Sequence, residues 1–463
     1  MADLKNGAEV KGGMIKPERF ATGLGVLMAT LGSAVGLGNI WKFPYLTGAN
    51  GGAAFLIVYL LCTLVVGFPI MVAEQMLGRK GRGDAVTSFM KIAPKTLWWL
   101  VGASGVLAAF LIMAYYTEVA GWVFAYVFKS FQPGLMTTDP AVTGAAFSQL
   151  VSNPVVSIAL QWIVLAVVGV IILFGVTKGI EATTKKLLPI LAILLVLIGI
   201  RSLTLPGASA GLAFLFKPDF SKLTTEAILT ALGLAFFKLS IGMGCMLTYG
   251  SYYDDKQNIP ANAARVVGAD LAVSLLAGIA IFPAVFAFGF EPTAGVQLLF
   301  ITIPTVFNSM PFGQLFMILF FILTAFASIG AMLSLLEVPV AFLINRTKLT
   351  RKWATLATVL SMALVGSLCA LSNSTLASFK IFGMTVFDLF DYTSSNILLP
   401  VGGLMISIFV GWVWGWPKFK ETLTNENTIS NVLLLKVIFN ILRFVTPLLV
   451  ILILLTGLKI IIL

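Results

Sequence analysis

Long apolar segments alternate with short polar connections along most of the 463-residue chain. A helix needs about 20 predominantly apolar residues to cross a lipid bilayer. Eleven segments meet that requirement: 20–46, 52–77, 98–129, 157–174, 179–202, 224–252, 262–289, 312–344, 353–371, 383–415 and 434–461. The main polar connections between them are 130–154, 205–223, 291–311 and 416–433. This pattern predicts an all-α integral membrane protein with about eleven transmembrane helices.

The connection 291–311 contains a short apolar piece surrounded by Pro292, Pro304 and Pro311. Proline interrupts a helix because it lacks a backbone N–H and clashes with the preceding turn. We therefore expect this connection to form a hairpin lid and not a further span.

The basic residues are distributed unevenly among the connections. They gather before the first helix, between the second and third, and between the eighth and ninth: Lys5, Lys11, Lys16, Arg19, Arg79, Lys80, Arg82, Lys91, Lys95, Arg346, Lys348, Arg351 and Lys352. Cytoplasmic connections of membrane proteins are enriched in Lys and Arg. We therefore predict a multi-pass protein of a bacterial-type plasma (inner) membrane, with a cytoplasmic N-terminus.

The composition agrees with a membrane protein and excludes several other classes. Hydrophobic residues make up 59% of the chain and charged residues 11%, whereas soluble domains contain about 25% charged residues. The net charge of +11 does not indicate nucleic-acid binding, because the basic residues stand singly or in pairs between apolar segments. The chain has no histidine, and no nucleophile–base set or metal-ligand cluster is visible. We therefore expect neither an enzyme nor a metal site.

Two of the apolar segments are interrupted by a Gly-x-Gly sequence, at Gly36–Gly38 and at Gly242–Gly244. The interruptions lie five helices apart, and this odd offset places the second half of the chain upside down relative to the first. Paired interruptions of this kind indicate a transporter site near the middle of the membrane. The alternative is that these glycines only allow close helix packing.

The residues around these interruptions resemble one protein family. Residues 32–45 are GSAVGLGNIWKFPY and residues 51–55 are GGAAF, which is similar to the first-helix motif of the neurotransmitter:sodium symporter family. The resemblance continues through Tyr115–Tyr116, Phe236–Phe237 and the sequence FDLFDY at 387–392, so it covers nearly the whole chain.

The resemblance implies the leucine-transporter fold, an inverted repeat of five plus five helices in which helices one and six are broken. It divides the chain into a cytoplasmic N-terminal segment (1–19), a first repeat with helices one to five (20–202), an extracellular connection (203–223), a second repeat with helices six to ten (224–415), and a cytoplasmic loop with helix eleven (416–463).

The resemblance also implies that an amino acid binds between the broken helices. Helix N-termini attract anions, so we expect the substrate carboxylate near Gly36, Gly38 and the hydroxyl of Tyr116. The full set of implied substrate-binding residues is Ala34, Gly36, Gly38, Ile112, Tyr116, Phe237, Ser240, Met243 and Leu335. Its side-chain pocket is apolar, which favours a neutral, apolar amino acid. Lys42 and Asp391 match the outer charged gate of the family.

The first sodium site of the family departs from its usual pattern in this chain. The aligned positions hold Ala34, Asn39, Lys238 and Asp270, where the last two are normally a hydroxyl residue and an asparagine. A lysine at the centre of a membrane helix requires a partner, and Asp270 is a suitable one. We therefore expect the ammonium group of Lys238, held near Asn39 and Asp270, to stand where sodium would bind.

The second sodium site is degenerate. Its aligned positions are Gly32, Val35, Ala327, Gly330 and Ala331, so carbonyl oxygens could remain but the usual side-chain hydroxyls are absent. Hard cations prefer oxygen ligands, and three carbonyls form a poor site. Sodium-independent relatives of the same fold place a helix-five lysine in this site. Lys186 could do the same, or it could be an ordinary cytoplasmic lysine beside Lys185.

Three other positions bear on gating and ions. The inner gate of the family pairs an N-terminal arginine with an acid at the end of helix eight, but this chain has Pro17 and Asn345 there, so Arg19 would need another partner. A chloride site is doubtful, because the helix-six glutamine of chloride-dependent relatives is replaced by Leu234. Glu118 is an intramembrane acid and thus a functional candidate, unless it faces the cytoplasmic vestibule.

The function predicted from the sequence is secondary transport of neutral, apolar amino acids by alternating access, with sodium dependence lost or reduced. Such a protein would be a proton-coupled transporter or an exchanger. A conventional sodium symporter and an amino-acid sensor that does not transport remain alternatives. The expected partners are the amino-acid substrate and the lipid bilayer, with no nucleic acid. No cofactor is expected, and sodium is not expected to be required.

Overall fold

The protein is described by a computed structural model that covers residues 18–132, 135, 137–290 and 298–457. Within these residues it is helical, and the only extended pairing is one isolated bridge between Ile381 and Met384. The predicted all-α fold is confirmed. Lys5, Lys11, Lys16, Pro17 and Pro292 lie outside the described residues.

The first half of the chain contains these helices: α1 (Gly23–Ala34), α2 (Phe43–Ala49), α3 (Ala53–Cys62), α4 (Phe68–Gly81), α5 (Ala85–Ile92), α6 (Trp99–Lys129), α7 (Pro140–Val151), α8 (Pro154–Leu173), α9 (Ala182–Leu203) and α10 (Ala208–Phe216). The second half contains these: α11 (Thr225–Lys238), α12 (Cys245–Ser251), α13 (Ile259–Ala287), α14 (Ile303–Asn308), α15 (Gly313–Arg346), α16 (Arg351–Ala370), α17 (Val386–Tyr392), α18 (Leu399–Ile408), α19 (Gly415–Leu423), α20 (Val432–Asn440) and α21 (Thr446–Gly457).

Short π-helical turns connect several of these helices into longer ones. They are η1 (Gly38–Lys42), η2 (Thr63–Gly67), η4 (Val176–Glu181), η6 (Leu298–Thr302), η8 (Thr393–Leu398), η9 (Phe409–Trp414) and η10 (Ile441–Val445). In the described part of the chain, nine helices are long and apolar enough to cross a membrane, and the bent pair α1 and η1–α2 adds a tenth. The broken pair α11 and α12 occupies the remaining predicted segment, 224–252. The expected number of about eleven spans therefore agrees with the structure.

The polar connections are more helical than the sequence analysis predicts. The connection 130–154 contains α7, 205–223 contains α10, and the tenth membrane helix continues through α19 to Leu423, beyond the predicted boundary at 415. Local capping explains α7, because the side chain of Asp139 accepts the N–H of Ala141 and Pro140 occupies the first turn. In the connection 291–311, the described residues 298–308 form η6 and the short helix α14, which is too short for a further span, as expected; the lid itself stays a prediction.

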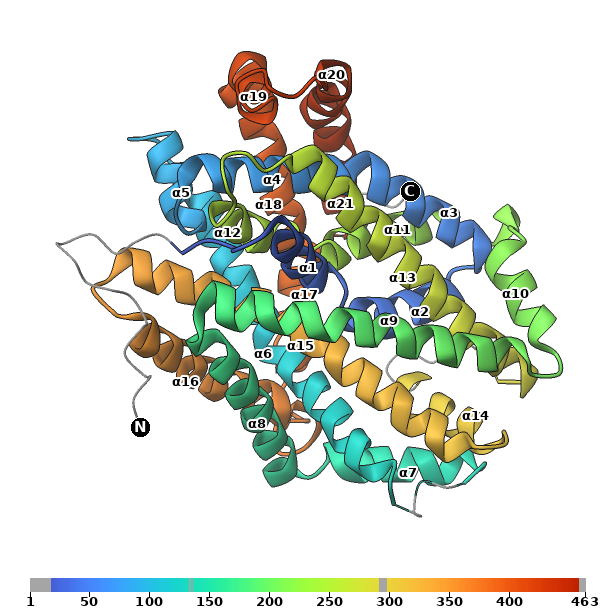
Figure 1. Cartoon of the computed structure of the whole chain (residues 1–463). Coiled ribbons are helices and arrows are strands. Elements are labelled where there is room, and N and C mark those ends of the chain that lie inside the picture. The colour runs from blue at the N-terminus through green and yellow to red at the C-terminus, as the bar shows by residue number, and fades with distance from the viewer. Residues whose placement is uncertain (1–17, 133–134, 136, 291–297, 458–463) are drawn as a thin grey trace.

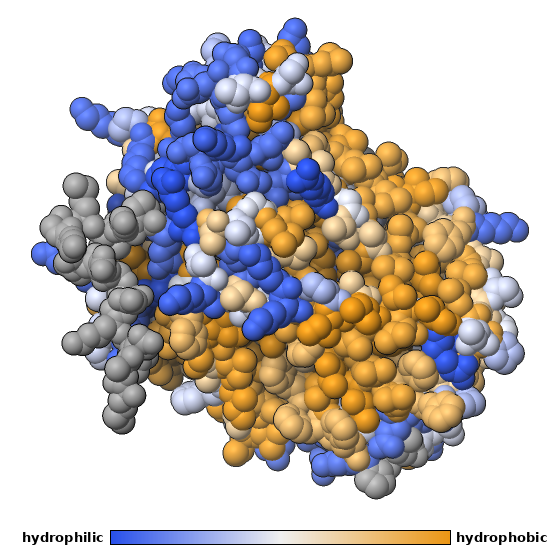
Figure 2. All heavy atoms as spheres, viewed as in Figure 1, coloured by the Kyte–Doolittle hydropathy of each residue, from blue (hydrophilic) through white to orange (hydrophobic). Residues whose placement is uncertain are grey.

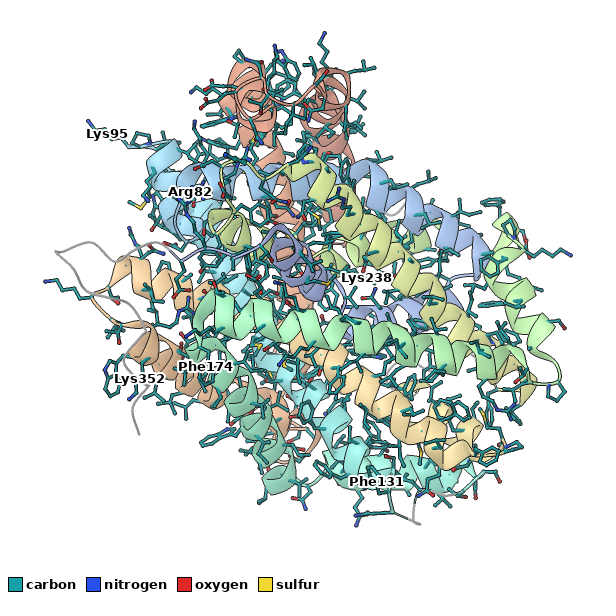
Figure 3. The ribbon with its side chains drawn as sticks, viewed as in Figure 1. Arg82, Lys95, Phe131, Phe174, Lys238 and Lys352 are labelled. Carbon is teal, nitrogen blue, oxygen red and sulfur yellow. The ribbon has the colours of Figure 1, made fainter. Side chains whose placement is uncertain are left out.

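The broken first helix lies inside the bundle, where α1 packs against α9, α13 and α15 (Figure 1). The long helix α9 crosses the front of the view, and α19 and α20 project at the top (Figure 1). A broad hydrophobic surface covers much of this face, with hydrophilic residues concentrated at the left and top (Figure 2). Arg82, Lys95 and Lys352 all lie toward the left (Figure 3). Basic residues of two predicted cytoplasmic connections thus share one side of the bundle.

The two helix breaks have local causes in the sequence. The first break follows Val35, whose ψ of 102° is extended and ends α1. The second break contains Ser240, Gly242 and Gly244 with φ values of 52°, 79° and 76°. A β-carbon at Gly242 would lie 2.4 Å from the carbonyl oxygen of Leu399. Glycine at this position therefore allows both the left-handed backbone and the close approach of α18.

Helices α4 and α12 approach each other closely enough to predict the effect of one substitution. A β-carbon at Gly78 would lie 1.9 Å from the carbonyl oxygen of Leu247, so Gly78→Ala must push the two helices apart. We expect this variant to unfold several degrees lower in thermal denaturation, because overpacking costs about 1–3 kcal/mol. Gly268→Ala is the matched control, since nothing lies within 4 Å of its β-carbon position. Equal melting temperatures for the two variants would contradict this account of the packing.

Candidate functional site

The two breaks meet at a small internal cavity near the centre of the bundle. Its lining residues are Ser33, Ala34, Gly36, Gly38, Ile112, Tyr116, Phe237, Lys238, Ser240, Met243, Ala331 and Leu335. All nine substrate-binding residues implied by the sequence resemblance are among them. The cavity volume is about 20 Å³, close to the space that one water molecule needs. The described conformation therefore leaves little space between the two breaks.

Side chains hold the unwound backbone of the first helix. The N–H of Leu37 donates to the hydroxyl oxygen of Tyr116 at 2.9 Å, and the N–H of Gly36 donates to Oδ1 of Asn39 at 3.1 Å. On the other side of the break, the Ser240 hydroxyl donates to the carbonyl oxygen of Ser33 at 2.7 Å. These bonds satisfy backbone groups that lipid could not satisfy, and they connect the two broken helices directly.

Close packing requires glycine at the first break. A β-carbon at Gly36 would lie 2.8 Å from the β-carbon of Ala331 and 2.9 Å from the Tyr116 hydroxyl oxygen. A β-carbon at Gly38 would lie 3.2 Å from Cγ of Lys238. The glycines therefore allow the backbone of the first helix to form one wall of the cavity.

Lys238 lies at the end of α11, beside the cavity, and its side chain is fully buried together with that of Asp270 (Figure 3). Its Nζ atom donates to the Asp270 carboxylate at 3.2 Å, to the Tyr59 hydroxyl oxygen at 2.8 Å and to the Ser274 hydroxyl oxygen. Asn39 does not contact the ammonium directly. Its amide nitrogen donates to the other carboxylate oxygen of Asp270 at 2.7 Å.

The structure therefore brings Lys238, Asp270 and Asn39 together, as the sequence analysis expects. The sequence analysis does not include Tyr59 and Ser274 in this set. Their hydroxyl groups complete the ligands of the ammonium. Both are polar residues inside the apolar segments 52–77 and 262–289, and this is the signal by which the sequence could have revealed them.

The region of the second sodium site is filled by close packing of α1, α9 and α15. A β-carbon at Gly330 would lie 2.9 Å from the carbonyl oxygen of Gly32, and the methyl group of Thr184 lies 2.8 Å from the β-carbon position of Gly32. Val35 and Ala327 are buried beside them. No side-chain oxygen of the predicted set takes the place of the missing hydroxyls.

Two serines of α15, Ser328 and Ser334, lie near this region. The Ser328 hydroxyl donates to the carbonyl oxygen of Ala325 at 2.7 Å, and the Ser334 hydroxyl donates to that of Ala331 at 2.8 Å. Lys186 is exposed and lies away from the site. The expectation that Lys186 could occupy the second site is wrong, because Thr184 is the residue of α9 that faces Gly32.

The predicted outer gate forms an ion pair above the cavity. Nζ of Lys42 lies 3.5 Å from the carboxylate of Asp391 and 4.1 Å from the centre of the Phe237 ring. The Ser395 hydroxyl donates to the same carboxylate at 2.8 Å. Phe237 thus separates these charges from the cavity, and an attractive cation–π contact holds the lysine over the ring.

A second ionic cluster, which we call the Arg351 network, joins the chain before α1 to helices α15 and α16. Arg351 donates to Glu18 at 2.6 Å and to Glu337 at 2.8 Å, and the Tyr252 hydroxyl donates to Glu337 at 2.5 Å. Burial raises the pKa of Glu18, against the opposing effect of Arg351. The sequence analysis missed this network, because it treated Arg351 only as an orienting charge and sought a partner for Arg19.

Glu118 lies outside both the cavity and these ionic clusters. The indole N–H of Trp122 donates to its carboxyl group at 2.7 Å, and only 1% of the residue is exposed. Glu118 therefore does not face an open vestibule, and it positions the ring of Trp122, which stacks on Phe387.

Comparisons with known proteins agree with this architecture. The family model "Sodium:neurotransmitter symporter family" matches residues 18–143 and 148–461. A Bacillus subtilis protein described as "Uncharacterized sodium-dependent transporter YhdH" is 41% identical, with 95% of this chain and 97% of the relative covered. A bovine sodium- and chloride-dependent GABA transporter 2 is 27% identical, with 89% and 75% covered. The crystal structure of MhsT in complex with L-phenylalanine matches with a TM-score of 0.89 and 40% identity, covering 96% of this chain and all of MhsT.

The Arg351 network predicts how one side of the bundle is held closed. Arg351→Gln leaves the buried carboxylate of Glu337 without its cation, and breaking a buried ion pair costs about 3–5 kcal/mol. We expect a cysteine placed at the buried residue Ala29 of α1 to react several-fold faster with a soluble maleimide in this variant. The exposed neighbour Lys352→Gln is the control. An unchanged labelling rate, or an equal rise in the control, would contradict a closing role.

Proposed function

This chain belongs to the sodium:neurotransmitter symporter family, and we propose that it transports neutral, apolar amino acids with a lysine in place of the first sodium ion. The family and its structural neighbours are membrane transporters, not enzymes. The observation that carries the proposal is the buried Lys238–Asp270 pair beside the cavity.

The bonding around Lys238 supports independence from sodium. Asp270 accepts hydrogen bonds from Lys238 and Asn39 on its two oxygens, and the amide oxygen of Asn39 accepts the N–H of Gly36. The groups that would bind an ion at the first site thus already have partners within the chain. A sodium ion would also have to enter beside a fixed ammonium, where like charges repel.

The second site supports the same conclusion by its packing. Gly330 lies directly against the carbonyl oxygen of Gly32, and the hydroxyls of Ser328 and Ser334 donate to carbonyls of their own helix. Sodium there would have to bind backbone carbonyls in a closely packed contact of three helices. We therefore propose that neither site requires sodium during transport.

The lining of the cavity supports an apolar, zwitterionic substrate. Ile112, Met243 and Leu335 offer apolar contact to a side chain, while Tyr116 supplies a buried hydroxyl for the carboxylate. The freed carbonyls at the break suit an ammonium group. Since the closed cavity is small, Phe237 must move for an amino acid to enter.

Whether transport is coupled to protons depends on whether Lys238 changes its protonation during the transport cycle. Release of its proton at one stage would couple transport to protons, whereas a permanently charged lysine would make the protein an exchanger. The clustering of Arg82, Lys95 and Lys352 on one side supports a cytoplasmic N-terminus, which we propose for a bacterial plasma membrane. A conventional sodium symporter is the second candidate, because the similar B. subtilis protein is described as sodium-dependent.

The apolar pocket predicts the order of substrate affinities. In competition with a radiolabelled apolar amino acid, we expect displacement by Leu, Ile, Val, Met or Phe and not by Asp, Glu, Lys or Arg. A charged side chain would be buried among apolar groups without a counterion, at a large desolvation cost. Strong displacement by charged amino acids, with none by apolar ones, would refute this substrate class.

The Lys238–Asp270 pair predicts the ion dependence. We expect the wild-type protein to bind and take up substrate equally well in sodium, potassium and choline salts at equal ionic strength. Lys238→Ala is expected to lose about 3–5 kcal/mol of stability, because Asp270 remains buried without its cation. Lys238→Thr combined with Asp270→Asn removes both charges and is the matched variant that should fold better.

Uptake into proteoliposomes, with sodium and pH gradients imposed separately, distinguishes the two candidate functions. Uptake that appears only with a sodium gradient and vanishes in choline would restore the conventional symporter. A double variant that gains sensitivity to sodium, in contrast to an insensitive wild type, would support the lysine as the replacement for the ion.

A further inference from the structure

A second cavity opens on the apolar surface of the bundle, away from the central site. It lies between the C-terminal end of α9 and the N-terminal part of α15 and has a volume of about 460 Å³. Its lining residues are Leu197, Ile200, Arg201, Thr204, Leu315, Phe316 and Leu319. We call this cavity the α9–α15 groove. The surface of these two helices is predominantly hydrophobic in Figure 2.

The walls of the groove suit an acyl chain. Five of the seven lining residues are apolar, and several of them are open to the surroundings, such as Ile200 at 55% and Leu315 at 52% exposure. Both helices are among those long and apolar enough to span a membrane. The natural medium around the groove is therefore lipid.

Arg201 gives the groove a charge preference. One of its terminal nitrogens donates to the Thr204 hydroxyl oxygen at 3.0 Å, and this hydroxyl donates back to the Arg201 carbonyl oxygen at 2.8 Å. Among the residues that the structure describes, no carboxylate lies within ion-pair distance of Arg201. Thr204 thus orients a guanidinium group whose remaining N–H donors point to no anion of the described chain.

We propose that the α9–α15 groove binds one anionic phospholipid. The acyl chain lies against Leu197, Leu315 and Leu319, and the phosphate accepts hydrogen bonds from Arg201. A guanidinium group binds phosphate oxygens in pairs, and a cation at the border of an apolar region is stabilised by such a partner. Charge complementarity thus selects an anionic headgroup over a zwitterionic one.

The position of the groove connects this lipid to the transport helices. Helices α9 and α15 also pack on α1 at the second sodium position, through Thr184 and Gly330. A lipid in the groove contacts both helices at once. The site is independent of the ion and substrate proposed above, so its test does not depend on transport activity.

The test is native mass spectrometry of the intact protein after exposure to equal amounts of phosphatidylglycerol and phosphatidylethanolamine. We expect the wild type to retain one phosphatidylglycerol in preference. Arg201→Gln should lower this retention roughly tenfold, as the loss of a charged hydrogen bond predicts. Lys217→Gln changes another exposed cation, in the connection that follows α9, and should retain the lipid.

A second variant tests the apolar part of the groove. Leu197→Trp fills the groove from an exposed position of α9 and should lower retention of the lipid without touching Arg201. Equal retention of both lipids by the wild type would overturn headgroup recognition. Retention unchanged in Arg201→Gln, or an equal loss in Lys217→Gln, would overturn the assignment of the phosphate to Arg201. Unchanged retention in Leu197→Trp would place the lipid elsewhere.

Discussion

The rest of the site depends on the need to neutralise one ammonium group buried inside a membrane bundle. Lys238 sits at the end of α11, and its counterion Asp270 comes from α13. The Tyr59 hydroxyl from α3 and the Asn39 amide from η1 then occupy the remaining positions around the pair. A buried charge is stable only when paired and fully hydrogen-bonded. One side chain thus fixes the relative positions of four segments.

The same bonds determine the conformation of the broken helices. Asn39 binds Asp270 with its nitrogen and the N–H of Gly36 with its oxygen, so the charge pair and the unwound backbone share one amide. Ser240 then connects the second break to the carbonyl oxygen of Ser33. Breaking the ion pair therefore also removes support from the wall of the cavity. The buried ion pair and the wall of the cavity thus form one hydrogen-bonded unit.

The sequence was sufficient to predict those parts of this unit that depend on local residues or on the long first-helix motif. The breaks follow from their glycines, and the Lys238–Asp270 pair follows from two opposite charges that replace neutral residues in apolar helices. The Arg351 network could not be predicted in this way, because Glu18 and Arg351 lie 333 residues apart and both resemble surface charges. The predicted role of Lys186 failed for a different reason, which is the direction of its side chain on the helix. It lies two residues after Thr184, and about 200° of helical rotation turns it away from α1.

The contact between Gly330 and Gly32 restricts which side chains position 330 can hold. A hydroxyl-bearing side chain at position 330 would bring its β-carbon to 2.9 Å from the carbonyl oxygen of Gly32. Helices α1 and α15 would have to separate before such a residue could fit, and separation would disturb Gly36 against Ala331 in the same interface. A single substitution that introduced a sodium ligand at position 330 would therefore cost packing energy before the ligand could bind an ion. A hydroxyl ligand at this position therefore requires compensating substitutions in the facing helix as well.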